Sequence, residues 1–446
     1  MTQQIPIHQL SALQARDMIL SGATRCTELM DVFFKFTDIA DQKIHAFSFI
    51  DREAIMRQAE LLDQTRERGT PTGPLFGIPI AIKDAIDTFD MPAEYGSSIH
   101  AGRHPRWDAP LAARLRQAGA IFFGKTKLPE FCLGKPADTC NPHNLAHTPG
   151  GSSSGSAAAV AAGMVPVAIG TQTVGSVIRP ASYCGVIGFK PTRGLISRSG
   201  LQPLSRTFDQ VGVFGRNIAD VAAVTEQMIG ADADDRSTIG TLTRPLLAVS
   251  QSKPPFPPKF VFIRTPFWDQ MDADAQEAMQ ALVDELGEQV VTLDLPQSAI
   301  LAKEWLMTAI EAEFAQTWAS ASDAELNQLS DALKDLIARG KSVNAVDYLD
   351  AISHIERVAE GFDEIFERFD AILTPSALGA APKGLDSTGN PIMSALWSYT
   401  GMPCISLPLL QNEAGMPIGV QVAGPLHDDA RLLRTSQWLM NHFSST

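Results

Sequence analysis

Residues Gly150–Gly170 read GGSSSGSAAAVAAGMVPVAIG, which predicts a glycine- and serine-rich loop, a helix and a strand in succession. Ser154–Ala162 is dominated by alanine, the strongest helix former, and Gly163 is typical of a helix C-terminus. The following VPVAIG is a short apolar run, as expected for a buried strand. A helix that leads directly into a buried strand is the repeating unit of an α/β fold.

The same alternation continues on both sides of this stretch. Gly77–Asp84 reads GIPIAIKD, where isoleucine occupies every second position, so a strand places Lys83 on the face opposite the isoleucines. Asp108 is predicted to cap a helix that ends near Ala118, and the strand AIFFG follows. The proline-rich segment KPPFPPK, Lys253–Lys259, is predicted to be a linker or a surface excursion.

The C-terminal part of the chain is predicted to be helical at first and then to form strands again. A long helical region is predicted at about 298–369, before strands in DAILTPS, CISLPLL and IGVQVAG and a final helix from Asp428. Strands that return after a helical excursion favour one sheet with an inserted helical layer. We therefore expect a single domain over residues 1–446, with two domains as the alternative.

Composition and charge exclude several classes of protein. The 446 residues are 45% hydrophobic, enough for a sizeable core, and the formal charge of −14 comes without a block of lysine and arginine that would follow a phosphate backbone. No run of eighteen apolar residues and no signal peptide is present, so we expect no nucleic acid, no membrane and a cytoplasmic location. The five cysteines form no CxxC pair and HExxH is absent, so we expect reduced thiols and neither metal nor cofactor.

A literal Walker A pattern, GAIFFGKT, lies at Gly119–Thr126. A phosphate-binding loop needs a strand before flexible glycines and a helix after them, so that backbone N–H groups can surround the phosphates. Here a helix comes first, and the variable positions are apolar and would themselves form a buried strand. The context therefore argues against ATP binding.

The residues Gly151, Ser153 and Gly155 match the nucleophile elbow G-x-S-x-G. That motif needs a strand that leads into the serine, and an acid and a histidine further along the chain. The preceding HNLAHTP is loop-like, and no downstream histidine has a suitable context. We therefore interpret Ser153 as a supporting residue near the site rather than as the nucleophile.

Several motifs in order along the chain resemble the amidase signature family. They are Lys83 in GIPIAIKD, then GGSSSGSAAAVAAG, GTQTVGSVIRPASYCGVIGFKPT, GMPCISLPLL and MPIGVQVAG. Within the family, NPHNLAHTPGGSSSGSAAA and TQTVGSVIRPA are most similar to bacterial malonamidase. The resemblance implies an α/β fold with a mixed β-sheet core flanked by helices on both faces, its signature core at about 60–240.

The resemblance also implies a catalytic triad. Its nucleophile maps to Ser176, its second serine to Ser152 after a cis peptide bond from Gly151, and its base to Lys83. The chemistry is intelligible from the residues, because a serine hydroxyl needs a base and an amine is the natural substitute where the motifs contain no histidine. Burial among apolar residues disfavours the ammonium form of lysine and lowers its pKa, which makes Lys83 a base at neutral pH.

The segment around Ser176 supplies further candidates. Backbone N–H groups of Thr173, Val174, Gly175 and Ser176, at a predicted helix start, are a candidate oxyanion hole. Arg179 follows Ser176 by about one helical turn and is a candidate for binding a substrate carboxylate, with a structural ion pair as the alternative.

Two positions in this segment depart from the family pattern. The family usually has aspartate where this chain has the uncharged Gln172, which would leave Arg179 free for an anionic substrate. The family has glycine where this chain has Val174, and a β-branched residue fills space beside the acyl site. The valine therefore puts the size of the substrate, and even activity, in question.

The sequence thus predicts an amidohydrolase for a linear, malonamate-like carboxamide, with a homodimer as one possible assembly. Carbamates, aryl amides and biuret-like compounds are the alternative substrates. Two other classes stay open: the amidase subunit of a glutamine-dependent amidotransferase, and a non-catalytic relative.

Overall fold

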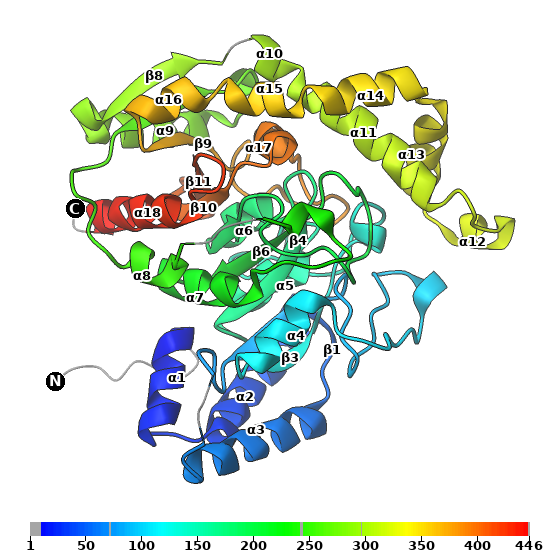
Figure 1. Cartoon of the computed structure of the whole chain (residues 1–446), viewed down its shortest axis with the longest axis vertical. Coiled ribbons are helices and arrows are strands. Elements are labelled where there is room, and N and C mark those ends of the chain that lie inside the picture. The colour runs from blue at the N-terminus through cyan, green and yellow to red at the C-terminus, as the bar shows by residue number, and fades with distance from the viewer. Residues whose placement is uncertain (1–9, 71–72, 241–243, 296, 445–446) are drawn as a thin grey trace.

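The computed structural model describes residues 10–70, 73–240, 244–295 and 297–444. A mixed sheet of eleven strands runs through this part of the chain, in the order β1-β3-β2-β4-β6-β5-β10-β11-β9-β7-β8 (Figure 1). The strands are β1 Phe47–Phe49, β2 Pro79–Lys83, β3 Ile121–Thr126, β4 Val167–Gln172, β5 Ile187–Lys190, β6 Gln210–Gly215, β7 Phe260–Arg264, β8 Val290–Asp294, β9 Ala371–Pro375, β10 Cys404–Gln411 and β11 Pro417–Ala423.

Helices cover both faces of the sheet, so the expected α/β class and mixed sheet are confirmed. They are α1 Ala12–Ser21, α2 Cys26–Ile44, α3 Arg52–Glu67, α4 Pro110–Gln117, α5 Ser154–Ala161, α6 Ile178–Cys184, α7 Ile218–Met228, α8 Leu246–Ser250, α9 Ala273–Leu286, α10 Gln297–Ile300, α11 Ala302–Thr317, α12 Asp323–Gln328, α13 Asp331–Ser342, α14 Ala345–Ser353, α15 Ile355–Glu360, α16 Asp363–Arg368, α17 Ala395–Thr400 and α18 Asp429–Ser444.

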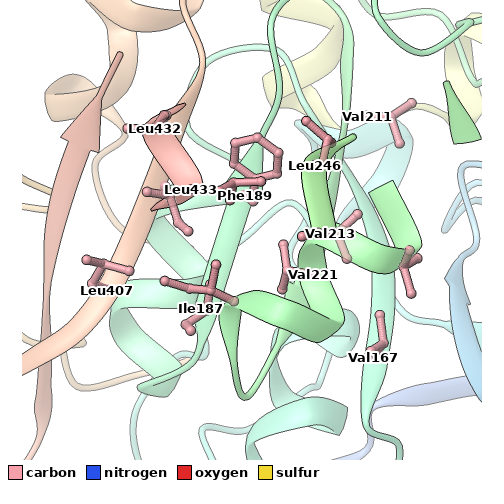
Figure 2. Close-up of a cluster of buried hydrophobic side chains, with 14 of the residues drawn as sticks. Val167, Ile187, Phe189, Val211, Val213, Val221, Leu246, Leu407, Leu432 and Leu433 are labelled. Carbon is pink, nitrogen blue, oxygen red and sulfur yellow. The ribbon is translucent and has the colours of Figure 1, made fainter. Parts of the chain in front are cut away.

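The alternation of side chains along each strand divides the core between the two faces. In β2, Ile80 and Ile82 join one apolar cluster while Ala81 joins another on the opposite face. Figure 2 shows part of the first cluster, where side chains of β4, β5, β6 and β10 meet side chains of α7, α8 and α18. By the same period, Lys83 lies on the face of Ala81, as predicted from the sequence.

The last hairpin, β10–β11, joins two parts of the sheet. β10 pairs antiparallel with β5, and β11 pairs antiparallel with β9. Strands β1–β6 lie on one side of this hairpin and strands β7–β9 on the other. Parallel pairs occur at β2 with β3 and β4, and at β7 with β8 and β9.

The predicted helical region forms helices α10–α16, which follow β8 and precede β9 along the chain. Figure 1 shows this layer at the end of the molecule opposite α1–α3. The proline-rich Lys253–Lys259 lies at the surface in irregular structure, with Phe256 80% exposed, as expected.

The predicted cap at Asp108 is wrong. The N-cap of α4 is Ala109, because Pro110 takes the first helical position, where its missing N–H costs nothing. The Asp108 carboxylate instead accepts from the Phe89 N–H at 3.0 Å and from Arg116 Nε at 2.8 Å.

Candidate active site

Lys83 ends β2 and is fully buried, at 0% exposure. Its Nζ lies 2.8 Å from Ser152 Oγ and 2.7 Å from Thr171 Oγ1. Burial lowers the pKa of Lys83, and the nearby thiol of Cys132 and carboxylate of Asp209 oppose that shift. The amine therefore sits among hydroxyl groups in surroundings that favour its neutral form.

Ser152 lies in the loop before α5, and the peptide bond from Gly151 is cis, as the resemblance implies. The loop packs against α6, since a Cβ on Gly150, where φ is 82°, would lie 2.9 Å from Pro180 Cα. This close approach, together with the left-handed backbone, accounts for glycine at position 150.

The other serines of the loop hold it against the sheet. Ser153 Oγ donates to Thr171 O at 3.2 Å, Ser154 Oγ to Gly150 O at 2.7 Å, and Ser156 Oγ to Ile169 O at 3.0 Å. These bonds satisfy buried hydroxyls and fix the approach to α5. Ser153 therefore faces a backbone carbonyl, and the segment before it is irregular rather than the strand that a nucleophile elbow needs.

Ser176 lies in the turn between β4 and α6 and is partly exposed. This turn adjoins the loop of Ser152, because Arg179 N donates to Gly175 O at 3.0 Å while the Arg179 side chain donates to Gly151 O at 2.6 Å. The structure thus brings Lys83 into contact with Ser152 and places the turn of Ser176 beside them.

We call Thr173–Ser176 the oxyanion loop. In the described part of the chain, the backbone N–H groups of Val174, Gly175 and Ser176 donate to no protein group, so they can bind an external oxygen. Ser398 Oγ on α17 holds the loop by donating to Val174 O at 2.6 Å. The half-buried Val174 side chain packs against an apolar cluster that includes Phe208 and Ile178.

The Gln172 side chain caps the N-terminus of α6. Its Oε1 accepts from the N–H groups of Val177 at 2.7 Å and Ile178 at 3.0 Å, while its Nε2 donates to Ser398 Oγ at 3.0 Å. The uncharged amide thus satisfies two N–H groups that a helix start leaves open. Thr171, Gln172 and Ser398 are residues whose roles at the site the sequence reasoning missed; the first two lie inside a recognised motif, whereas no local pattern marks Ser398.

Arg179 is 5% exposed, and none of the ion pairs between described residues includes it. Its Nη1 donates to Gly389 O at 2.7 Å, and its Nη2 donates to Gly151 O and to Thr388 Oγ1 at 3.1 Å. Within the described ranges, its buried Nε has no hydrogen-bond partner. Burial lowers the pKa of Arg179 to about 10, which still leaves a cation at neutral pH.

The competing motifs have structural explanations. Gly119–Thr126 contains β3 and is followed by irregular structure, and the Lys125 amine donates to Ile86 O inside the protein. Cys184 is fully buried, and burial raises the pKa of its thiol, which makes it a poor nucleophile. The described residues include no group of His, Cys, Asp and Glu side chains arranged to hold a metal ion, and no helix there is long and apolar enough to cross a membrane.

Comparison with known proteins identifies the family. The family model described as Amidase matches residues 28–433, so the chain belongs to that family. It is an enzyme of the class that hydrolyses amide C–N bonds.

Curated relatives include a glutamyl-tRNA(Gln) amidotransferase subunit of Heliobacterium modesticaldum, 32% identical over 96% of each chain. Its counterpart in a Psychrobacter species is 31% identical over 98% of this chain and 96% of the relative.

Solved structures give the same fold. One neighbour belongs to a vestigial protein complex that reveals the evolutionary origins of an s-triazine catabolic enzyme, with a TM-score of 0.90, 26% identity, and coverage of 97% of this chain and 98% of that chain. Another is the peptide amidase of Stenotrophomonas maltophilia, with a TM-score of 0.84, 27% identity and coverage of 98% of both chains. The curated relatives above are components of amidotransferases, so they support the family and not a particular likeness to malonamidase.

Proposed function

We propose that the protein is an amidohydrolase that cleaves a linear carboxamide to a carboxylate and ammonia or an amine. The observation that carries the proposal is the fully buried Lys83, whose Nζ lies 2.8 Å from Ser152 Oγ beside the turn of Ser176. A buried lysine next to a serine is a general base once its pKa is lowered, and burial lowers the pKa of Lys83.

The reaction then runs in two halves. Ser176 Oγ attacks the amide carbon and gives its proton to Ser152 Oγ, while the Ser152 proton passes to neutral Lys83 Nζ. The protons return through Ser152 to the leaving nitrogen, the C–N bond breaks, and an ester on Ser176 remains. Water repeats the sequence on the ester, which releases the carboxylate and restores the serine.

The negative charge of each tetrahedral intermediate falls on the former carbonyl oxygen. The free N–H groups of Val174, Gly175 and Ser176 suit that oxygen, and the Thr173 N–H completes the predicted set. Losing one such donor costs about 3 kcal/mol of transition-state stabilisation in enzymes where it has been removed.

Arg179 supports the proposed substrate class. A buried guanidinium without a carboxylate carries an uncompensated positive charge, and its Nε still lacks an acceptor. A carboxylate on the substrate would supply the missing negative charge. A short monoamide with a free carboxylate, malonamate or a close analogue, is therefore the proposed substrate.

The test is to map a fluorophosphonate adduct on the intact protein by mass spectrometry. We expect modification of Ser176 and its loss in Ser176→Ala, while Ser153→Ala keeps the label because Ser153 only supports the loop. An adduct on Ser153 would overturn the assignment of the nucleophile. An unlabelled wild-type protein would favour a non-catalytic relative, for which Val174 is the distinguishing residue.

A second function is favoured by the curated relatives, which are amidotransferase subunits. In that role Ser176 would hydrolyse glutamine and pass ammonia to another protein. Release of ammonia from glutamine only together with a copurifying partner would select this function, whereas turnover of malonamate by the purified chain alone selects the first. Turnover of a carbamate, an aryl amide or biuret in place of malonamate would keep the mechanism and change the substrate class.

A further inference from the structure

Asp209 lies opposite the oxyanion loop because of the register of the sheet. β4 pairs antiparallel with β6, and Gln172 at the end of β4 is opposite Gln210 at the start of β6. In an antiparallel pair, the residue after one strand faces the residue before the other. Thr173, which begins the oxyanion loop, therefore faces Asp209.

Three donors converge on the Asp209 carboxylate. Thr173 Oγ1 donates to Oδ1 at 2.5 Å, and the N–H groups of Leu204 and Ser205 donate to Oδ2 at 2.9 Å each. Asp209 is only 7% exposed, and none of the ion pairs between described residues includes it. Burial of a carboxylate is costly, and here hydrogen bonds rather than a paired cation offset that cost.

This arrangement fixes the direction of the Thr173 side chain. Because its hydroxyl proton is donated to Asp209, the hydroxyl has no proton to give to a substrate, and the backbone of the loop remains as the donor to the oxyanion. A side chain tied to a buried carboxylate limits the rotation of its own backbone, which orients the N–H groups of the loop. Preorganised donors stabilise developing charge better than donors that must first reorient.

The hydrogen bonds around Asp209 continue into the helical layer α10–α16. Ser205 Oγ donates to the Glu313 carboxylate of α11, which also accepts from Tyr348 OH of α14 at 2.9 Å. The segment that carries the two N–H donors of Asp209 is therefore itself held by α11. The chain of contacts runs from α14 and α11 through Ser205 and Asp209 to Thr173.

We propose that Asp209 is a positioning residue for the oxyanion loop and acts on the reaction through Thr173. This inference rests on the proposed function, since it takes Ser176 as the nucleophile. The Asp209 carboxylate contacts Thr173, Leu204 and Ser205, so its expected effect is on the rate at which charge develops on the bound oxygen. Substrate affinity should change little, because the ground-state carbonyl depends less on the oriented donors than the transition state does.

The experiment measures the second-order rate of Ser176 labelling by a fluorophosphonate, whose reaction also develops charge on an oxygen. The rates are compared at a pH where Lys83 is neutral, because the Asp209 charge also raises the pKa of Lys83. We expect about a tenfold lower rate in Thr173→Val and in Asp209→Asn, and a double variant no slower than the slower single variant, because one change removes and the other weakens the same hydrogen bond. Thr173→Ser keeps the hydroxyl and should restore a rate near that of the wild type. With malonamate, the loss should appear in kcat and leave KM nearly unchanged.

A matched control comes from the N-terminal helices. Asp63 is fully buried and accepts from Thr27 Oγ1 at 2.8 Å and from the Cys26 N–H at 2.7 Å, so its threonine and backbone donors resemble those of Asp209. Unlike Asp209, it also pairs with Arg25 Nε at 3.4 Å. Asp63→Asn and Thr27→Val should lower the melting temperature without changing the labelling rate of folded protein.

Three outcomes would overturn the inference. Single variants that label at the wild-type rate would show that Asp209 does not act through Thr173, and so would losses that multiply in the double variant. In either case, labelling of Ser176 in the wild type would leave the proposed function standing. Absence of labelling in the wild type would contradict the proposed function itself and this inference with it. If Asp209→Asn does not fold, equal labelling rates in Thr173→Val and Thr173→Ser would still overturn the inference, because the bond to Asp209 needs the hydroxyl.

Discussion

Three buried lysines in this protein differ in the groups they contact. Lys190 donates to Met402 O at 2.6 Å and to Gln210 Oε1 at 2.9 Å, and Lys125 donates to Ile86 O. Carbonyl oxygens can only accept, so these partners hold the lysine N–H groups in place. Lys83 instead contacts two hydroxyls, which can accept a proton or give one away. The chemistry of the partner, and not burial alone, distinguishes the candidate base.

The pH dependence of the reaction should report Lys83. Its pKa is lowered by burial, and only the neutral amine accepts a proton, so the labelling rate of Ser176 should rise with pH to a midpoint below the usual lysine pKa of about 10.4. Lys83→Arg keeps a cation that cannot act as a base and should lower the rate at least about 100-fold. An unchanged rising limb in Lys83→Ala would exclude Lys83 as the base.

The charge of Arg179 should matter for anionic substrates. Arg179→Gln removes the cation and some of the bonds to Gly151 O and Gly389 O, so activity on any amide should fall. The loss of kcat/KM should be at least about 30-fold greater with malonamate than with propionamide, because only malonamate has a carboxylate that would pair with the Arg179 cation. Arg179→Lys, which keeps the charge, should retain part of the preference. Equal losses on both substrates would leave Arg179 a purely structural role.

At the scale of the element, α6 is short and begins two residues after Ser176, the proposed nucleophile. It starts at Ile178, and its N-cap Val177 offers no side-chain hydrogen bond. Gln172 supplies the missing acceptor from the end of β4, and through Ser398 it also ties the helix start to α17. The position of Ser176 therefore depends on an amide that precedes it in the chain.

Replacing Gln172 should affect both stability and chemistry. Gln172→Leu leaves two N–H groups without their acceptor, and we expect a loss of about 1–2 kcal/mol in the free energy of unfolding and slower labelling of Ser176. Gln172→Glu keeps the acceptor oxygens and should lose less. Denaturant unfolding and labelling rates measure the two effects.

The cap of α7 provides the control. Asn217 Oδ1 accepts from the Asp220 N–H at 2.7 Å. Asn217 follows the end of β6 that pairs with the start of β4, whereas Gln172 lies at the other end of that pair, so Asn217→Ala should cost about 1 kcal/mol with no effect on labelling. A Gln172→Leu protein that labels as fast as the wild type would show that the cap does not position Ser176.

At the scale of the whole molecule, the sequence predicts what local patterns encode. The isoleucine period placed Lys83 on the correct face of β2, and the order of the motifs indicated the family. The cap of α4 was assigned wrongly because both Asp108 and Pro110 compete for the helix start, and only the partners of Asp108 decide between them.

Contacts between distant segments escaped the sequence analysis. Gln172 and Ser398 meet across 226 positions, and Arg179 and Gly389 across 210, with no periodicity to join them. The same holds for Thr173 and Asp209, which only the pairing of β4 with β6 brings together.

The hairpin β10–β11 has a consequence for the order in which the protein is made. A ribosome delivers β1–β9 before this hairpin, yet in the described sheet the hairpin is what connects β5 to β9. Arg179 bonds Thr388 and Gln172 bonds Ser398, and both of these partners are synthesised shortly before the hairpin. Domains fold as their segments leave the ribosome at about 5–20 residues per second. The nascent chain therefore carries Ser176, the proposed nucleophile, for many seconds before the partners of Gln172 and Arg179 are made, so we expect activity only when translation is nearly complete.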